Sequence, residues 1–155
     1  KKTIPHPIRD KSSNLLGEGC TVCRDICPKN KKLQPIQGFT PPKELLHPPQ
    51  LKVCDMTDDE WEEGFAMTLM GFFLMDKKYL QRNAAIGLGN FKDERALDVL
   101  AKVLECGDDE VRGYAAWALG KIGGAKAVQS LNSALQKTNT AAVKEEIESA
   151  LKSVQ

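Results

Sequence analysis

The sequence predicts an all-α protein, a short solenoid of helical hairpins preceded by a loop-rich segment that carries cysteines. All eight prolines lie between Pro5 and Pro49, and proline interrupts long helices. Beyond Pro49 the chain has no proline, and apolar residues recur at helical spacings of three and four. A pattern of about 31 residues repeats through this half. We therefore divide the chain into residues 1–53 and a helical part, residues 54–155.

The helical part should open with a helix that covers one end of the solenoid. Thr57-Asp58-Asp59-Glu60 has the pattern of a capping box, in which Thr57 and Glu60 satisfy each other's amides. The carboxylates of this first turn also complement the helix dipole, so we assign them a structural role. Apolar residues then continue through Trp61 and Phe65, which predicts one helix over residues 57–76.

Internal repetition is the strongest pattern in the sequence. The segment LQRNAAIGLGN, which starts at Leu80, aligns with VRGYAAWALGK, which starts 31 residues later at Val111. A half repeat, VKEEIESALK, begins another 32 residues on at Val143. We expect repeats at residues 80–110 and 111–142 and a half repeat at 143–155, in which three leucines are equivalent: Leu88, Leu119 and Leu151.

Each unit should be a helical hairpin that buries its apolar face by stacking on the next. Small residues at Ala84, Ala85, Ala115 and Ala116 allow close helix approach. Helices are expected to stop at Gly89, Gly107, Gly120 and the Gly123-Gly124 pair, and to be capped by Asp93, Asp108 or Asp109, and Asn139 or Thr140. The pattern resembles the HEAT-like repeats over about half the chain. That resemblance implies a surface that binds proteins or nucleic acids.

The front segment contains a cysteine run, Cys20-x2-Cys23-x3-Cys27-Pro28. This spacing is typical of the last three cysteines of bacterial ferredoxin runs, whose thiolates hold [4Fe–4S] clusters. Cys54 is a candidate for a further ligand, whereas Cys106 ends a predicted repeat helix and is expected to be structural. A disulfide, a zinc site and inert thiols stay open as alternatives, although His6 and His47 stand alone and zinc sites tend to pair two ligand units.

Taken together, the cysteine run and the repeat motifs LxRNAAxxLGN and VRxxAAWALGKIG resemble the C-terminal part of the epoxyqueuosine reductase family. In that family a cobalamin-binding domain precedes two [4Fe–4S] clusters and HEAT-like repeats, and a tRNA wobble base is reduced. The resemblance implies that Cys20 and Cys23 bind one cluster and Cys27 the other. It also places Arg82 and Trp117 at repeat-motif positions.

The chain departs from that family in several places. The first cysteine run, the isolated cysteine between the runs and the cobalamin domain are absent, and Pro28-Lys29-Asn30 replaces the usual Pro-Trp-Asn. Residues 65–78 are also more apolar than the basic stretch expected there. The resemblance thus implies a partial oxidoreductase that needs an upstream domain or a partner chain for further cysteine ligands and cobalamin.

Charge is distributed unevenly between the two parts. Residues 1–52 carry ten Lys and Arg against four Asp and Glu, a net +6, while the remainder carries twelve against seventeen, a net −5. Basic residues beside the cysteines and in the repeats are candidates for tRNA phosphates, in the repeats Arg82, Arg112, Lys121 and Lys126. Arg82 and Arg112 have a second interpretation, bonding between neighbouring repeats.

Two functions remain open. The first is the electron-transfer and tRNA-docking portion of a reductase-like protein, and the second is a noncatalytic repeat adaptor that binds another protein. No phosphate-binding loop or nucleophile elbow is visible in the sequence, which disfavours a self-contained enzyme. The longest apolar run, residues 65–75, is too short to span a membrane, and no signal-type region follows Lys1, so we expect a cytoplasmic protein without a membrane partner.

Overall fold

A computed structural model of the chain describes residues 3–11, 26–32 and 49–154. These residues form helices and turns, with no strand among them. The helices are α1 (His6–Arg9), α4 (Gln50–Cys54), α5 (Asp58–Gly64), α6 (Leu69–Leu74), α7 (Lys77–Phe91), α8 (Leu97–Cys106), α9 (Asp109–Ile122), α10 (Gly124–Lys137) and α11 (Ala141–Val154), with short 3-10 turns at Asn30–Lys32 and Glu94–Ala96.

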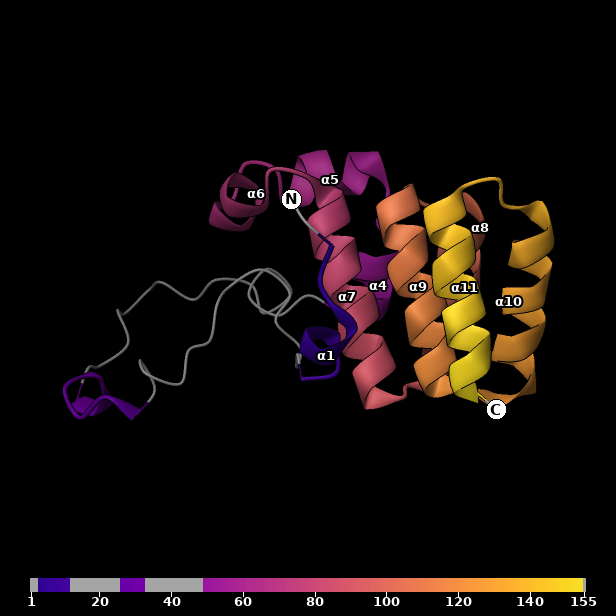
Figure 1. Ribbon diagram of the computed structural model, residues 1–155. Coiled ribbons are helices and arrows are strands. Elements are labelled where there is room, and N and C mark those ends of the chain that lie inside the picture. Colours follow the sequence, from indigo (N-terminus) through magenta and orange to yellow (C-terminus); the bar gives the residue numbers. More distant parts are fainter. Residues whose placement is uncertain (1–2, 12–25, 33–48, 155) are drawn as a thin grey trace.

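The helices form two rows (Figure 1). Helices α7, α9 and α11 lie side by side in a front row, and α4, α8 and α10 form the row behind it. The core lies between the rows, where Leu80, Leu100, Leu119, Leu131 and Ile147 are fully buried. The prediction of an all-α solenoid built from stacked hairpins is therefore confirmed.

The row behind begins with a helix that the sequence did not predict. Helix α4 packs against α7 and α8, and both Val53 and Cys54 are 0% exposed. Pro49 lies at its N-cap, where a proline does not block the helix. The first hairpin of the stack is thus made of α4 and α7, and the core extends upstream of the expected first repeat.

The helix expected over residues 57–76 is in fact two helices, α5 and α6, with a break between them. The capping box is confirmed, since Thr57 Oγ1 accepts from the Glu60 amide at 3.2 Å. At the break, Thr68 caps α6 by accepting from the Gly71 amide at 3.3 Å. A Cβ on Gly71 would lie 2.3 Å from the carbonyl oxygen of Ala66, so glycine is required at this turn.

Two of the glycines expected to end helices lie inside them instead. Gly89 is within α7 and Gly120 within α9. A Cβ on Gly89 would approach the Ala118 Cα to 2.9 Å, and one on Gly120 would approach the Ala150 Cα to 2.9 Å. These glycines are therefore explained by close helix packing, which a sequence pattern cannot distinguish from helix termination.

Other predicted termini agree with the structure. Gly107 and Gly123 are the C-caps of α8 and α9. The Asp108 carboxylate caps α9 by accepting from the Glu110 amide at 2.9 Å. Helix α7 ends at Phe91, and its C-cap Lys92 adopts a left-handed conformation with φ of 51° and donates its amide to the Gly89 carbonyl.

None of the helices in the described part of the chain has the length and apolar character needed to cross a lipid bilayer.

Candidate functional site

The structure describes one member of the cysteine run. Cys20 and Cys23 lie outside the described residues. Cys27 is half-buried, and its carbonyl accepts from the amides of Asn30 and Lys31 at 3.0 and 3.2 Å, which forms a tight turn after the cysteine. Its thiol is free. Among the described residues there is no group of three or more potential metal ligands.

Cys54 lies in a different environment from Cys27. Its thiol is buried in the core beside Val53 and Met56, and burial together with the negative charge of Asp55 raises its pKa to about 12. Metal ligation requires the thiolate, which this setting disfavours. We therefore leave Cys54 out of the ligand set proposed below. Cys106, at the end of α8, is exposed and also free.

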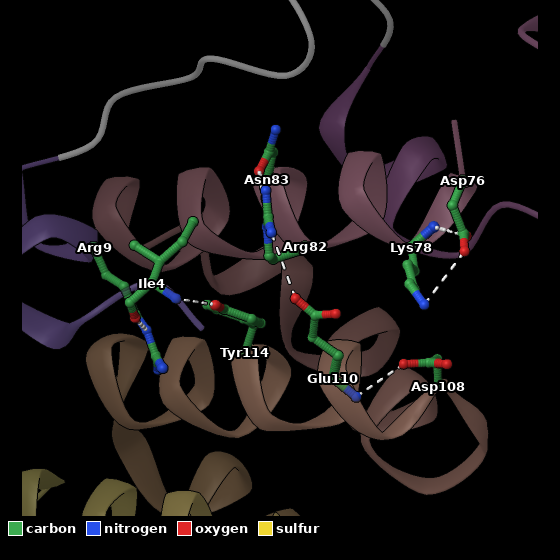
Figure 2. Close-up of polar contacts among 9 residues, drawn as sticks. All are labelled: Ile4, Arg9, Asp76, Lys78, Arg82, Asn83, Asp108, Glu110 and Tyr114. Atoms are coloured by element: carbon green, nitrogen blue, oxygen red, sulfur yellow. Dashed lines mark hydrogen bonds and ion pairs between the residues drawn. The ribbon is translucent and has the colours of Figure 1, made fainter. Parts of the chain in front are cut away.

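Arg82 joins the first two helices of the front row. Its Nη1 lies 3.4 Å from the Glu110 carboxylate on α9 (Figure 2). Its guanidinium carbon lies 5.1 Å from the centre of the Tyr79 ring. The side chain is only 11% exposed. Arg82 thus supports the packing of α7 on α9 and presents little of its charge to solvent.

Arg112 has a comparable role at the back of α9. Its Nε donates to the Leu104 carbonyl at 2.8 Å, and its two terminal nitrogens bond Asp109 and the buried hydroxyl of Thr138 at 2.8 and 3.0 Å. One side chain therefore ties together the ends of α8, α9 and α10. For Arg82 and Arg112 the contacts match the second interpretation given above, bonding between repeats.

The two candidate lysines are more accessible, and each is paired. Lys121 Nζ lies 2.6 Å from Asp10, and Lys126 Nζ lies 2.6 Å from Asp98. Their side chains are 37% and 56% exposed. Lys121 lies in the last turn of α9 and Lys126 in the first turn of α10, on either side of the Gly123-Gly124 turn.

The most deeply buried charge among the described residues is one that no sequence pattern predicted. Arg9 is 1% exposed, and its guanidinium forms two bonds to the Glu146 carboxylate on α11 at 3.0 and 2.7 Å. Its Nε donates to the Ile4 carbonyl at 2.7 Å, and the ring of Tyr114 lies 4.3 Å away. Nothing in the Pro-rich surroundings of Arg9 marks it in a single sequence.

Beside Arg9, a hollow of about 440 Å³ opens between α9 and α11. Four carboxylates line it, from Asp109, Glu110, Glu145 and Glu146, and His6 and Arg9 lie at its edge. Three of these carboxylates are already paired with arginines, Asp109 with Arg112, Glu110 with Arg82 and Glu146 with Arg9. Glu145 adds a further negative charge, so the hollow does not suit an anionic ligand such as a phosphate.

The HEAT repeats family model matches residues 74–152. Two curated epoxyqueuosine reductases match most of the chain. That of Bacillus anthracis is 34% identical over 142 residues, which are 88% of this chain and 36% of the relative. That of Bacillus subtilis (strain 168) is 35% identical over 153 residues, which are 96% of this chain and 38% of the relative. A Geobacillus stearothermophilus relative, named only as an uncharacterized protein in the gldA 3′ region, is 36% identical over 150 residues, 95% of this chain and 68% of the relative.

Solved structures give the same relation. The crystal structure of an epoxyqueuosine reductase with a tRNA-Tyr epoxyqueuosine-modified stem loop superposes with a TM-score of 0.86 at 32% identity, over 98% of this chain and 40% of that one. A structure of the Bacillus subtilis reductase has a TM-score of 0.85 at 31% identity, over 99% and 41%. The chain thus spans well under half the length of these relatives, as the resemblance to a C-terminal part implied. The chain belongs to the HEAT repeat family and is similar, over nearly its whole length, to part of an epoxyqueuosine reductase.

Proposed function

We propose that this chain is the iron–sulfur and tRNA-docking portion of an epoxyqueuosine-reductase-like system, which takes part in tRNA queuosine modification without catalysing it alone. The observation that carries the proposal is similarity along nearly the whole chain, which includes the cysteine run as well as the repeats. Relatives that shared only a HEAT array would not match the front segment. The reducing domain would then come from an upstream domain or a partner.

Thiolates of Cys20, Cys23 and Cys27 would supply the cluster ligands. The described residue of this set fits the role, because Cys27 is free, partly accessible and held at a tight turn by its own carbonyl. When bound, such a cluster supplies single-electron transfer. Three cysteines do not complete two clusters, so further ligands would come from outside this set.

The docking of tRNA would use the two accessible lysines of the array. Lys121 and Lys126 can exchange their aspartate partners for phosphate oxygens, since exposed ion pairs contribute little free energy. Arg82 and Arg112 would support the array and contact RNA only weakly, because their donors are already bonded. The net −5 of residues 53–155 favours a few placed contacts over broad electrostatic binding.

Fluorescence anisotropy with a labelled tRNA-Tyr anticodon stem loop tests this docking. We expect Lys121→Gln and Lys126→Gln each to weaken binding a few-fold and to lower the slope of log affinity against log salt by about 0.7–0.9 per lost phosphate contact. Lys137→Gln is the matched control, since Lys137 is an exposed lysine of α10 paired with Glu105. Binding that is absent at low salt, or that all three variants leave unchanged, would contradict the docking.

The acidic hollow favours a second candidate, a repeat adaptor that binds a basic protein surface. Its carboxylates, Glu145 among them, suit lysine or arginine side chains better than RNA. This candidate predicts a protein that holds no iron and ignores the stem loop, so the same measurements separate it from the first.

A further inference from the structure

We propose that the front row of helices is a binding site for a short, arginine-bearing peptide segment, and that the chain's own residues 3–11 occupy it. We call this segment the strap. It includes the short helix α1 and lies over α7 and its neighbours in Figure 1. Nothing in the similarity to known proteins assigns this site.

The site holds the Arg9 side chain in a pocket built for a guanidinium. Glu146 accepts two parallel bonds from the terminal nitrogens, and the rings of Tyr114 and Trp117 lie 4.3 and 6.0 Å from the guanidinium carbon. A planar cation with several fixed donors fits this arrangement, whereas the single ammonium of lysine cannot form the paired bonds. A charge buried this deeply needs such a partner to be tolerated.

The site also holds the backbone of the strap. The Ile4 amide donates to the Tyr114 hydroxyl at 2.7 Å, as Figure 2 shows. The Asn90 side-chain amide donates to the Arg9 carbonyl at 2.7 Å. Lys121 also pairs with Asp10 at 2.6 Å, an exposed contact that contributes little to holding the strap. These side chains therefore hold the backbone of the strap as well as its Arg9 side chain.

These contacts come from equivalent positions in successive repeats. In the repeat alignment, Tyr114 and Glu146 occupy the same position of the second and third units, and Asn90 and Lys121 occupy the same position of the first and second. The strap therefore crosses the repeats over two rows of side chains that project from one face. A repeated scaffold with varied residues at fixed face positions is the usual form of a repeat-protein binding surface.

The strap has a consequence for the cysteine run that rests on the proposed function. The strap ends at Lys11, and the run follows it in sequence before the chain returns to the array at α4. Contacts at the strap and the burial of Val53 and Cys54 fix both ends of this stretch on the array. Arg9 is therefore a positioning residue for the segment that would carry the cluster.

Hydrogen exchange on the full-length chain tests whether Glu146 holds the strap. We expect Glu146→Gln, which keeps the shape of the side chain, to speed amide exchange in residues 3–11 at least about tenfold, because local opening sets the exchange rate. Lys137→Gln is the control, since it also removes an ion pair, the one between Lys137 and Glu105, but in the row of helices behind. Circular dichroism confirms that each variant keeps its helices. Strap exchange that is equal in all three proteins would overturn the proposal.

Binding in trans tests whether the site recognises an arginine-bearing peptide. The probe is a fluorescent peptide with the sequence of residues 1–11, added to the full chain with Arg9→Ala, in which the strap no longer fills the pocket. We expect this variant to bind the peptide saturably and at least about tenfold more tightly than the wild type does, because the strap competes in the wild type. It should also bind at least about tenfold more tightly than the double variant Arg9→Ala/Glu146→Gln. A probe with lysine in place of arginine should bind more weakly.

Equal binding to all of these proteins, or none to the Arg9→Ala chain, would overturn the peptide site. Neither measurement needs iron or RNA. A failure of the proposed function would appear separately, as wild-type protein without iron or stem-loop binding, while the strap is judged by exchange and peptide binding alone.

Discussion

The repeat array and the α5–α6 segment that precedes it pack in opposite ways. In the array the front helices approach until glycine and alanine meet, as at Gly89 with Ala118 and Gly120 with Ala150. In the α5–α6 segment, Met67, Phe72 and Met75 are 96%, 75% and 81% exposed. Repetition produces an array in which each helix has a neighbour that matches its face. A segment outside the repeat buries only some of its apolar residues, here Trp61 and Leu74, so its apolar pattern alone does not predict which of them are buried.

The largest effect is expected where the array is closest packed. Gly120→Val should lower the free energy of unfolding by about 3 kcal/mol or more, because a Cβ there would already lie 2.9 Å from the Ala150 backbone and side chain. Gly113→Ala on the same helix is the matched control, since its Cβ would meet only Glu146 at an ordinary 3.5 Å. Alanine's better helix propensity should make this variant neutral or more stable by up to about 1 kcal/mol. Chemical denaturation of both measures the difference, and equal losses would contradict the close-packing account.

Cys54 should make the stability of the array depend on alkaline pH. The unfolded thiol ionises near its ordinary pKa of 9.0, while burial keeps the folded thiol protonated up to about pH 12. Its contribution is therefore complete below about pH 9 and is lost as the pH rises from 9 towards 12. Over that range the free energy of unfolding of the wild type should fall more steeply than that of Cys54→Ala, by up to about 1.4 kcal/mol per pH unit. Parallel curves for the two proteins would show that this thiol ionises as easily in the folded protein as in the unfolded one.

Arg112→Met should cost about 2–3 kcal/mol of stability. The change leaves the Leu104 carbonyl and the buried Thr138 hydroxyl without their charged donor. Lys137→Met removes a cation from an exposed pair nearby and should change the free energy of unfolding by less than about 1 kcal/mol. Urea titration measures the free energy of unfolding of both variants. An equally small loss for both would contradict the role of Arg112 in bonding the repeats together.

The smallest effect is expected at the end of α7. Lys92 has a φ of 51°, a region that glycine occupies without strain. Lys92→Gly should therefore raise the free energy of unfolding by about 0.5–1 kcal/mol, measured as a shift of the denaturation midpoint without a change of slope. A loss of stability would mean that the lysine side chain contributes more than its backbone strain costs.

The sequence was informative where its signals were local or repeated. The 31-residue repeat placed the front row, and the Thr57 capping box and the Asp108 cap are present as expected. Helix α4 was missed because its five residues follow two prolines and show no periodicity long enough to read. The break before α6 was missed because Thr68 and Gly71 lie inside an apolar run, where their capping role is visible only in three dimensions.

The site was harder to predict than the fold, for a physical reason. Arg82 and Arg112 were singled out by charge, and their availability depends on partners such as Glu110 and Thr138 that other helices bring. Arg9 lies 137 residues from Glu146 in sequence, so no local pattern announces their pairing. Long-range partners decide whether a basic residue is a ligand contact or part of the scaffold, and a single sequence does not contain that information.

Iron and acid-labile sulfide analysis of anaerobically reconstituted protein, with its visible spectrum, tests the central claim most directly. The wild type is compared with a Cys20→Ser, Cys23→Ser and Cys27→Ser triple variant, and with Cys54→Ala. We predict a broad absorption near roughly 400 nm with bound iron and sulfide in the wild type and in Cys54→Ala, and its loss in the triple variant with the array still folded. A folded, colourless and iron-free wild type, or colour that the triple variant retains, would contradict the assignment of the front segment to electron transfer.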